Sequence, residues 1–175
     1  MIRMQLSRIL IRELMDYQVI ELREVLDDLE GDVAHAKPRM FPIVIGLPEA
    51  QAIERRLAGI EIKRPQTHDL LASVVEALGA ELFAIEIHDL ADNTFFARLR
   101  LRAPGGDEAE VDSRPSDAIA LGVATGVPIF VAEHVIDAAT ATPVGEDDDA
   151  GSDDDSGIGP ELDLDDDDDE DEGPF

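Results

Sequence analysis

The last thirty residues of this chain are so acidic that they restrict any folded domain to the residues before them. Between Glu146 and Phe175 there are 17 acidic residues and no basic residue. Five of the aspartates are consecutive, at 165–169, and such a run repels itself and stays hydrated. We therefore expect residues 140–175 to form a disordered acidic tail and residues 1–139 to form a single folded domain.

The rest of the composition suits one domain and limits the kinds of partner. The chain has 175 residues, of which 44% are hydrophobic, and this is enough for one core. The whole sequence holds 41 acidic and 14 basic residues, so subtracting the 17 acidic residues of the tail leaves 24 against 14, a net charge of −10. Such a domain does not favour non-specific nucleic-acid binding, which depends on basic surface.

Three absences from the sequence bear on where the protein acts. There is no cysteine, which excludes disulfides and thiolate chemistry. No apolar stretch approaches the roughly 18 residues of a membrane-spanning helix. The first residues, Met1 to Leu6, lack the apolar region and cleavage site of an export signal. We expect a soluble, cytoplasmic protein with no membrane partner.

Apolar and turn-forming residues are arranged in a way that predicts strands mixed with helices. Strands are expected where apolar residues alternate or form a short run, and helices where they recur every three to four positions. The expected strands are 4–11 (less clearly than the others), 19–25, 41–46, 82–88, 94–101, 108–112 and 127–131, and the expected helices are 48–58, 67–78, 115–126 and 132–139. A long polar connection is expected at 26–39. This order predicts an α+β fold with a mixed β-sheet packed with about three to four helices.

The helix expected from Thr67 begins with three polar residues, Thr67, His68 and Asp69. Thr67 can cap the helix, and its buried face would consist of Leu70, Leu71, Val74, Val75 and Leu78. A helix start favours an anion, so His68 could transfer a proton or contact a phosphate, and Asp69 could bind a metal. The simpler alternative is that Thr67 only caps the helix and Asp69 only complements its dipole.

A second polar run, from Asp112 to Asp117, precedes the next expected helix. Pro115 presets the backbone for a helix start, and Ser113 or Asp112 can cap it. Asp112 and Asp117 could bind a divalent cation, and Arg114 could contact a phosphate. The alternative is that Arg114 and Asp117 form an internal ion pair that fixes the turn.

Other charged residues give weaker signals. Glu49 lies in the first turn of the helix expected at 48–58, where an acidic residue more often faces solvent or complements the dipole. Arg98, Arg100 and Arg102 alternate along one expected strand and therefore share a face. That face is either a row of phosphate contacts or an ordinary solvent-exposed surface. Sequence motifs of nucleotide-binding loops, zinc sites and nucleophile elbows are absent.

Five segments of the chain resemble, as a set, a known family. The two most specific are Thr67-His68-Asp69-Leu70-Leu71 and Arg114-Pro115-Ser116-Asp117-Ala118-Ile119-Ala120-Leu121. The other three are Phe41–Gly46, Glu49–Ile53 and Asp92–Ala97. In this order, over roughly residues 3–139, they are similar to the bacterial bifunctional nuclease domain, also called the DNase-RNase domain. The polar segment 27–37 and the extreme acidity of the tail depart from the family pattern.

The resemblance implies a compact α+β domain, usually a homodimer, that hydrolyses both DNA and RNA. The family's characteristic polar positions fall on Glu49, Thr67, His68, Asp69, Asp112, Arg114, Ser116 and Asp117. From the chemistry of these groups we expect His68, Asp69 and Asp117 to be catalytic, and Thr67, Arg114 and Ser116 to bind substrate. The expected ligands of Mg²⁺ or Mn²⁺ are Glu49, Asp69, Asp112 and Asp117. Such a cation would also offset the repulsion between an acidic domain and a phosphate.

Two further hypotheses follow from the acidic tail. In one, the domain is a non-enzymatic dimeric interaction module, and the tail mimics nucleic acid or binds a basic protein. In the other, the tail inhibits the nuclease by competing with substrate for Arg98, Arg100, Arg102 or Arg114. Removal of the tail distinguishes them, because it would abolish partner binding in the first case and raise nucleic-acid binding in the second.

Overall fold

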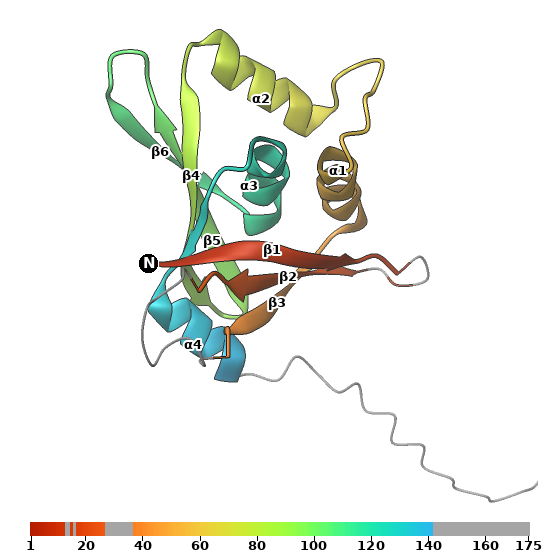
Figure 1. Ribbon diagram of the computed structural model, residues 1–175, viewed down its shortest axis with the longest axis vertical. Coiled ribbons are helices and arrows are strands. Elements are labelled where there is room, and N and C mark those ends of the chain that lie inside the picture. The colour runs from red at the N-terminus through yellow and green to blue at the C-terminus, as the bar shows by residue number, and fades with distance from the viewer. Residues whose placement is uncertain (13–14, 16, 27–36, 142–175) are drawn as a thin grey trace, which may run out of the picture. The chain divides into compact units, whose positions relative to one another are not determined.

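The computed structural model describes residues 1–12, 15, 17–26 and 37–141. These residues form a seven-stranded sheet, four α-helices and a short 3-10 turn, Val123–Thr125 (Figure 1). The strands are β1 (Ile2–Leu10), β2 (Gln18–Glu24), β3 (Met40–Ile45), β4 (Glu81–Ala91), β5 (Thr94–Arg102), β6 (Glu108–Ser113) and β7 (Ile129–Val131). The helices are α1 (Leu47–Leu57), α2 (Thr67–Ala77), α3 (Pro115–Gly122) and α4 (Glu133–Ala141).

The sheet is mixed, with the order β3-β2-β1-β7-β4-β5-β6. Neighbouring strands pair antiparallel except for β4 and β7, which are parallel. Figure 1 shows α1, α2 and α3 gathered on one side of β1, with α4 on the other side of that strand. α3 packs on β4 and β5, whereas α4 packs on β3 and β4. The predicted α+β class, with a mixed sheet and four helices in one domain, is confirmed.

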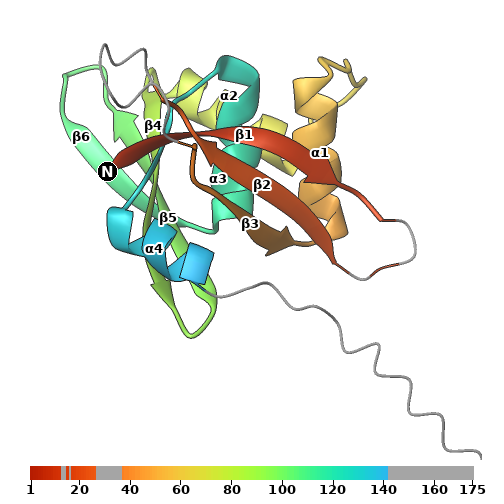
Figure 2. The same ribbon diagram turned by 60° about the horizontal axis from the view of Figure 1, so that its bottom comes forward.

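Alternation of apolar and polar residues explains how the strands face the core. In β2, Ile20 and Leu22 are completely buried, whereas Arg23 is exposed. Ile20 pairs in register with Ile9 of β1 and Ile43 of β3. These strands therefore present one continuous apolar surface to the core, and Figure 2 shows α1 and α3 behind them.

The hairpin between β4 and β5 turns where the sequence predicts it. Asp92 and Asn93 connect the strands, with φ angles of 49° and 57°. A two-residue hairpin loop needs positive φ, which aspartate and asparagine tolerate better than most residues. The predicted turn at these two residues is confirmed.

α2 differs from the sequence prediction in the face that it buries. Its N-cap is Gln66 rather than Thr67, and the Gln66 N–H donates to Asp69 Oδ2 at 3.0 Å. None of its residues is fully buried, and four predicted core residues are between 45% and 71% exposed: Leu70, Leu71, Val74 and Leu78. The prediction of a buried face was therefore wrong for these four. The reason is that α2 turns its other apolar side, with Ala72 and Val75, toward the rest of the domain.

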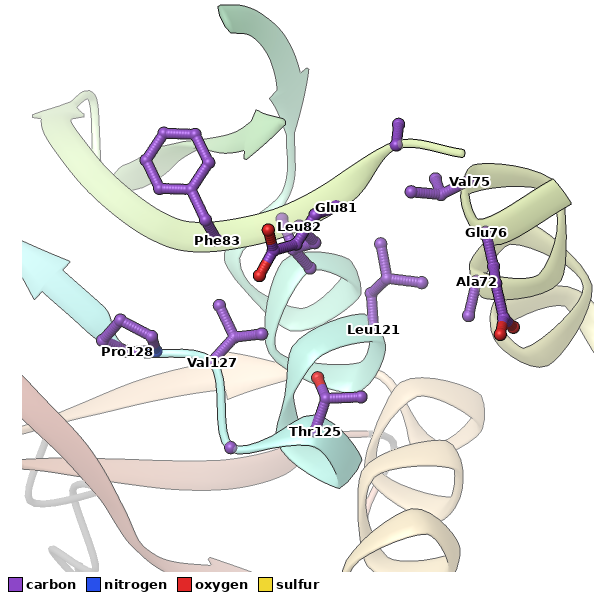
Figure 3. Close-up of a pocket in the computed structure, with 12 residues that line it drawn as sticks. Ala72, Val75, Glu76, Glu81, Leu82, Phe83, Leu121, Thr125, Val127 and Pro128 are labelled. Atoms are coloured by element: carbon purple, nitrogen blue, oxygen red, sulfur yellow. The ribbon is translucent and has the colours of Figure 1, made fainter. Parts of the chain in front are cut away.

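A cavity of about 530 Å³ lies beneath this inner side of α2 (Figure 3). Ala72 and Val75 of α2 line it together with Leu121 of α3 and Phe83 of β4. The described residues that line it include none of those predicted for the functional site. The cavity leaves Ala72 and Val75 only partly buried, because this side of the helix spans a hollow instead of resting on a filled core.

Several predicted boundaries shift by a few residues. α3 ends at Gly122 instead of 126, and the 3-10 turn after it ends at Thr125 and is capped by Gly126, whose φ is 68°. α4 continues to Ala141, beyond the expected limit of 139. Most of the connection expected at 26–39 and nearly all of the acidic tail lie outside the described residues, so their predicted conformations and the domain limits stay predictions. Among the described residues, no helix is long and apolar enough to cross a membrane.

Candidate functional site

Glu49, His68, Arg114 and Asp117 form one hydrogen-bonded chain across three helices, and we call these four residues the polar cluster. Arg114 Nη2 donates to Glu49 Oε1 at 2.7 Å and to Asp117 Oδ1 at 3.0 Å. Arg114 Nε donates to Asp117 Oδ2 at 2.6 Å. His68 Nε2 lies 3.0 Å from Asp117 Oδ1. The structure thus brings together predicted site residues from both polar runs and from α1.

Helix starts position the four side chains. Arg114 is the extended N-cap of α3, a proline follows it, and Asp117 is the third helical residue, so both side chains share one turn. His68 is the second residue of α2, and Glu49 lies in the first turn of α1. Gly46 precedes α1, and a Cβ at this position would displace the Glu49 carboxylate. Unpaired N–H groups at all three helix starts favour negative charge at this place.

Asp117 sets the orientation of the His68 ring. A carboxylate only accepts hydrogen bonds, so Nε2 of His68 carries the proton in this contact. In the neutral ring the lone pair then lies on Nδ1, for which the described part of the chain offers no hydrogen-bond partner. The pair can therefore accept a proton at Nδ1 while Asp117 holds the other ring nitrogen.

The polar cluster is open at Arg114. Its side chain is 66% exposed, compared with 32% for Asp117, 16% for His68 and 15% for Glu49. Hydrogen bonds to Asp117 and then to Glu49 raise the pKa of the Arg114 guanidinium. Burial raises the pKa of the Asp117 carboxyl, but hydrogen bonds from Arg114 and His68 outweigh it and the net pKa lies below its ordinary value. Asp117 is therefore an anion at neutral pH.

Asp69 lies next to His68 in the sequence but contacts different partners. Its Oδ2 accepts from Arg55 Nη2 at 2.7 Å, and its Oδ1 accepts from Arg56 Nη1 at 2.5 Å. Arg56 Nη2 also donates to the Leu121 carbonyl at 3.1 Å. Burial by itself raises the pKa of the Asp69 carboxyl. Hydrogen bonds from a backbone N–H and from the two guanidinium groups have the larger, opposite effect, so the net pKa lies below its ordinary value. These bonds connect α1, α2 and α3.

Arg55 and Arg56 are not among the residues predicted for the site. Both belong to the last turn of α1, and their side chains are only 14% and 9% exposed. One signal could have identified them. Neither has an acidic residue three or four positions away in α1, although they adjoin the buried Ala52 and Ile53. Arginines in that situation need a carboxylate from another element.

Three other predicted site residues lie outside the polar cluster. Thr67 is exposed at the first position of α2, and Ser116 is buried, with 6% exposure. Asp112 is an exposed residue of β6. In the described part of the chain, no hydrogen bond or ion pair joins any of the three to the polar cluster. Their roles in substrate or metal binding stay predictions, and Ser116 would need its hydroxyl to become accessible.

The arginine row on β5 is paired with carboxylates. Arg98, Arg100 and Arg102 share one face, as their alternation predicts. They pair at 2.6 to 3.3 Å with three glutamates of the neighbouring strands, Glu86, Glu108 and Glu110. This face is therefore a ladder of cross-strand ion pairs, and its arginines are already neutralised.

The predicted metal ligands are divided between these sets of ion pairs. Glu49 and Asp117 bond to Arg114, Asp69 bonds to two other arginines, and Asp112 stands apart. Within the described residues, no group of three histidine, aspartate or glutamate side chains is arranged to hold a metal. Oxygen donors of the kind that Mg²⁺ and Mn²⁺ prefer are present, but guanidinium groups neutralise those of Glu49, Asp69 and Asp117. These residues do not form a ready metal site, and metal binding stays a prediction.

Comparison with known proteins gives a consistent family. The model of the bifunctional nuclease domain matches residues 32–143, more than half of the chain. An uncharacterized protein of Mycobacterium tuberculosis is 42% identical over 98 residues, which are 56% of this chain and 57% of that protein. Bifunctional nuclease 2 of Arabidopsis thaliana and bifunctional nuclease 1 of Oryza sativa subsp. japonica are each 26% identical over 98 residues, 55% of this chain and 30% of theirs.

The family match includes every residue of the polar cluster and the ion pairs of Asp69. The similarity to the individual relatives is narrower, because it spans less than two thirds of the length of each of them. It therefore concerns a domain, and not the whole of those proteins. Both the five sequence segments and the family match support the same conclusion: the chain belongs to the bifunctional nuclease domain family.

Proposed function

We propose that this chain hydrolyses phosphodiester bonds of DNA and RNA at the polar cluster. The observation that carries the proposal is the 3.0 Å contact between His68 Nε2 and Asp117 Oδ1, with Arg114 on the same carboxylate. Membership of the family and the names of the plant relatives support the substrate class. A base, an orienting carboxylate and an exposed cation are the groups that such a hydrolysis requires.

The reaction uses each member of the polar cluster in a separate role. Water attacks phosphorus while its proton passes to Nδ1 of His68, and Asp117 stabilises the imidazolium that forms. The bond from phosphorus to the leaving oxygen breaks, and this oxygen takes a proton from solvent. Arg114 binds the phosphate, because its Nη1 makes no hydrogen bond to the described residues and a planar guanidinium suits phosphate oxygens.

The proposal includes Mg²⁺ or Mn²⁺ as a cofactor, and Glu49 and Asp117 are the residues with the best-placed oxygens. The cation would neutralise negative charge on the phosphate. Both carboxylates are bound to Arg114, so a cation would have to compete with the guanidinium for them. None of the proton transfers described above passes through the metal.

Cleavage of labelled DNA and RNA tests this function. The full chain would be assayed with Mg²⁺, with Mn²⁺ and with EDTA, beside a His68→Ala variant. We expect His68→Ala to lower the rate by about 100-fold or more. The matched control is His134→Ala, since His134 is 66% exposed and its partner is Asp89, outside the polar cluster. Equal cleavage by the His68 variant would show a contaminant or a misplaced site.

The exposed side of α2 favours a second candidate, a non-enzymatic dimeric interaction module. Leu70, Leu71, Val74 and Leu78 form an aliphatic stripe, and exposed apolar patches often mark protein interfaces. In this candidate the stripes of two copies pack against each other in a dimer, and the acidic tail binds a basic protein or mimics nucleic acid. The homodimer also fits the nuclease, so cleavage, and not assembly, decides between the two candidates.

Light scattering tests the dimer. Leu71→Glu would place a charge within the stripe, and we expect it to yield monomers. Val44→Glu is the control, because Val44 is 54% exposed on β3, outside the stripe. A monomeric unaltered chain, or a dimer that survives Leu71→Glu, would contradict this interface.

Removal of residues 146–175 tests the role of the tail. It would abolish binding to a basic partner if the chain is an interaction module, and it would raise nucleic-acid binding if the tail inhibits a nuclease.

A further inference from the structure

Most cations of this acidic chain are already neutralised. Of its 14 lysines and arginines, eight contact a carboxylate: Arg8, Arg39, Arg55, Arg56, Arg98, Arg100, Arg102 and Arg114. Arg3 also has an interaction partner. The other five have no carboxylate partner within the described part of the chain: Arg12, Arg23, Lys37, Lys63 and Arg64. Free cations bind a phosphate without giving up a partner in the protein, so these five limit where a nucleic-acid strand can bind.

Two of these five, Lys63 and Arg64, are adjacent and close to the polar cluster. Both are exposed and belong to the segment 58–66 between α1 and α2, which Figure 1 shows leading into the start of α2. Arg64 is four residues from His68, which limits their separation to about 14 Å even in a fully extended chain. At about 3.4 Å per phosphate along one strand, that distance corresponds to at most about four nucleotides.

We propose that Lys63 and Arg64 bind the phosphates next to the one that is cleaved, and so hold the substrate strand across the start of α2. This inference rests on the proposed nuclease function and adds the residues that position the strand. Pro65 and the extended Gln66, with φ of −86° and ψ of −179°, fix the backbone between the two cations and His68. The strand would pass the N–H groups at the start of α2 on its way to Arg114.

The composition of this surface indicates how the strand is recognised. The sequence has no phenylalanine, tyrosine or tryptophan between Phe41 and Phe83, so the imidazole of His68 is the one aromatic ring that α1, α2 and the segment between them offer to a base. The contacts are therefore with the phosphate backbone, which DNA and RNA share. Binding of this kind depends strongly on salt and little on base sequence, which suits an enzyme that cleaves both nucleic acids.

The test measures binding apart from cleavage. Fluorescence anisotropy would follow fluorescein-labelled single-stranded DNA and RNA with the full chain carrying His68→Ala. Adding Lys63→Ala and Arg64→Ala should weaken binding about 3- to 10-fold and reduce the slope of log K against log salt by about 1.4, since each single-strand phosphate contact contributes about 0.7. The control, Arg23→Ala with Lys37→Ala, removes two other free cations and should change affinity less than twofold.

Cleavage kinetics add a second readout. With His68 intact, the Lys63 and Arg64 substitutions should raise KM and leave kcat nearly unchanged, because they remove strand binding and not chemistry. Unchanged binding and salt slope, or an equal loss in the control, would overturn the inference while the nuclease function could stand. Binding that depends on the two cations without any cleavage would overturn the nuclease function alone. No binding by the chain would overturn the inference.

Discussion

Asp69 and Asp117 occupy the same position in two helices but have opposite surroundings. Each is the third residue of its helix. Asp69 meets two arginines whose side chains are 14% and 9% exposed, whereas Asp117 meets one arginine that is 66% exposed and a histidine. A carboxylate at a helix start is common to both sites, and its partners decide whether it joins helices through buried ion pairs or belongs to a cluster that is open to solvent.

The largest expected effect is a loss of cleavage in Asp117→Asn, which distinguishes Asp117 from Asp69. Asp117→Asn keeps the shape of the side chain but removes the negative charge that accepts the hydrogen bond from Nε2 of His68. We expect cleavage to fall about 100-fold or more, with the Tm changed by less than about 3 °C. Single-turnover cleavage and thermal melting would measure this. A large fall in Tm would mean that Asp117 has the same structural role as Asp69, and the contrast would fail.

The same substitution at Asp69 should act mainly on stability. Asp69→Asn leaves two largely buried guanidinium groups without an anion, which costs about 2 kcal/mol. For a chain of this size the Tm should fall by about 4 to 8 °C, with cleavage at 25 °C within about threefold of the unaltered chain. If activity is lost while the Tm is kept, Asp69 belongs to the chemistry, as the sequence hypothesis has it.

Acid should remove the contribution of Asp69 in the unaltered chain. Its pKa in the folded protein lies below the ordinary value of 3.8, so the unfolded chain takes up a proton first as the pH falls. The stabilisation is complete above about pH 5 and is lost as the pH falls through 3.8 toward the folded pKa. Urea unfolding over this pH range would measure the free energy of unfolding, which should depend less on pH in Asp69→Asn than in the unaltered chain. An identical dependence in the two chains would exclude Asp69 as its source.

The smallest expected effect concerns the competition between Arg114 and a metal. Arg114→Gln frees the carboxylates of Glu49 and Asp117, so we expect Mn²⁺ to bind about 3- to 10-fold more tightly, as measured by electron paramagnetic resonance. Arg102→Gln is the matched control, because Arg102 also pairs with a carboxylate at the surface. Adding Glu49→Gln should cancel the gain. Equal affinity in all variants would place any metal elsewhere.

Local patterns were enough to predict most elements and one contact of the polar cluster. Alternation predicted β2, and Asp92 with Asn93 predicted the hairpin turn. The pairing of Arg114 with Asp117 lies within one helical turn, so spacing offered it as an alternative to metal binding. Features that depend on a few neighbouring residues could thus be predicted from the sequence alone.

The remaining contacts depend on how the helices pack. His68 and Asp117 are 49 residues apart, and Glu49 and Arg114 are 65 apart, so only the packing of the helices brings them together. No local signal assigns Asp69 to arginines on another helix. Periodicity also could not identify the inner side of α2, because the helix is apolar on both sides and only the position of α3 and β4 decides which one faces inward.

The three residues of β7 have a consequence for the order in which the domain assembles. β7 pairs with β1 on one side and β4 on the other, and it is the link between the β1–β3 and β4–β6 halves of the sheet. A chain emerging from the ribosome can form two separate meanders, but the sheet cannot become continuous before residue 131 is available. Closure between β1 and β7 then joins residues about 130 positions apart, so the last native contacts are also among the most distant and the slowest to form.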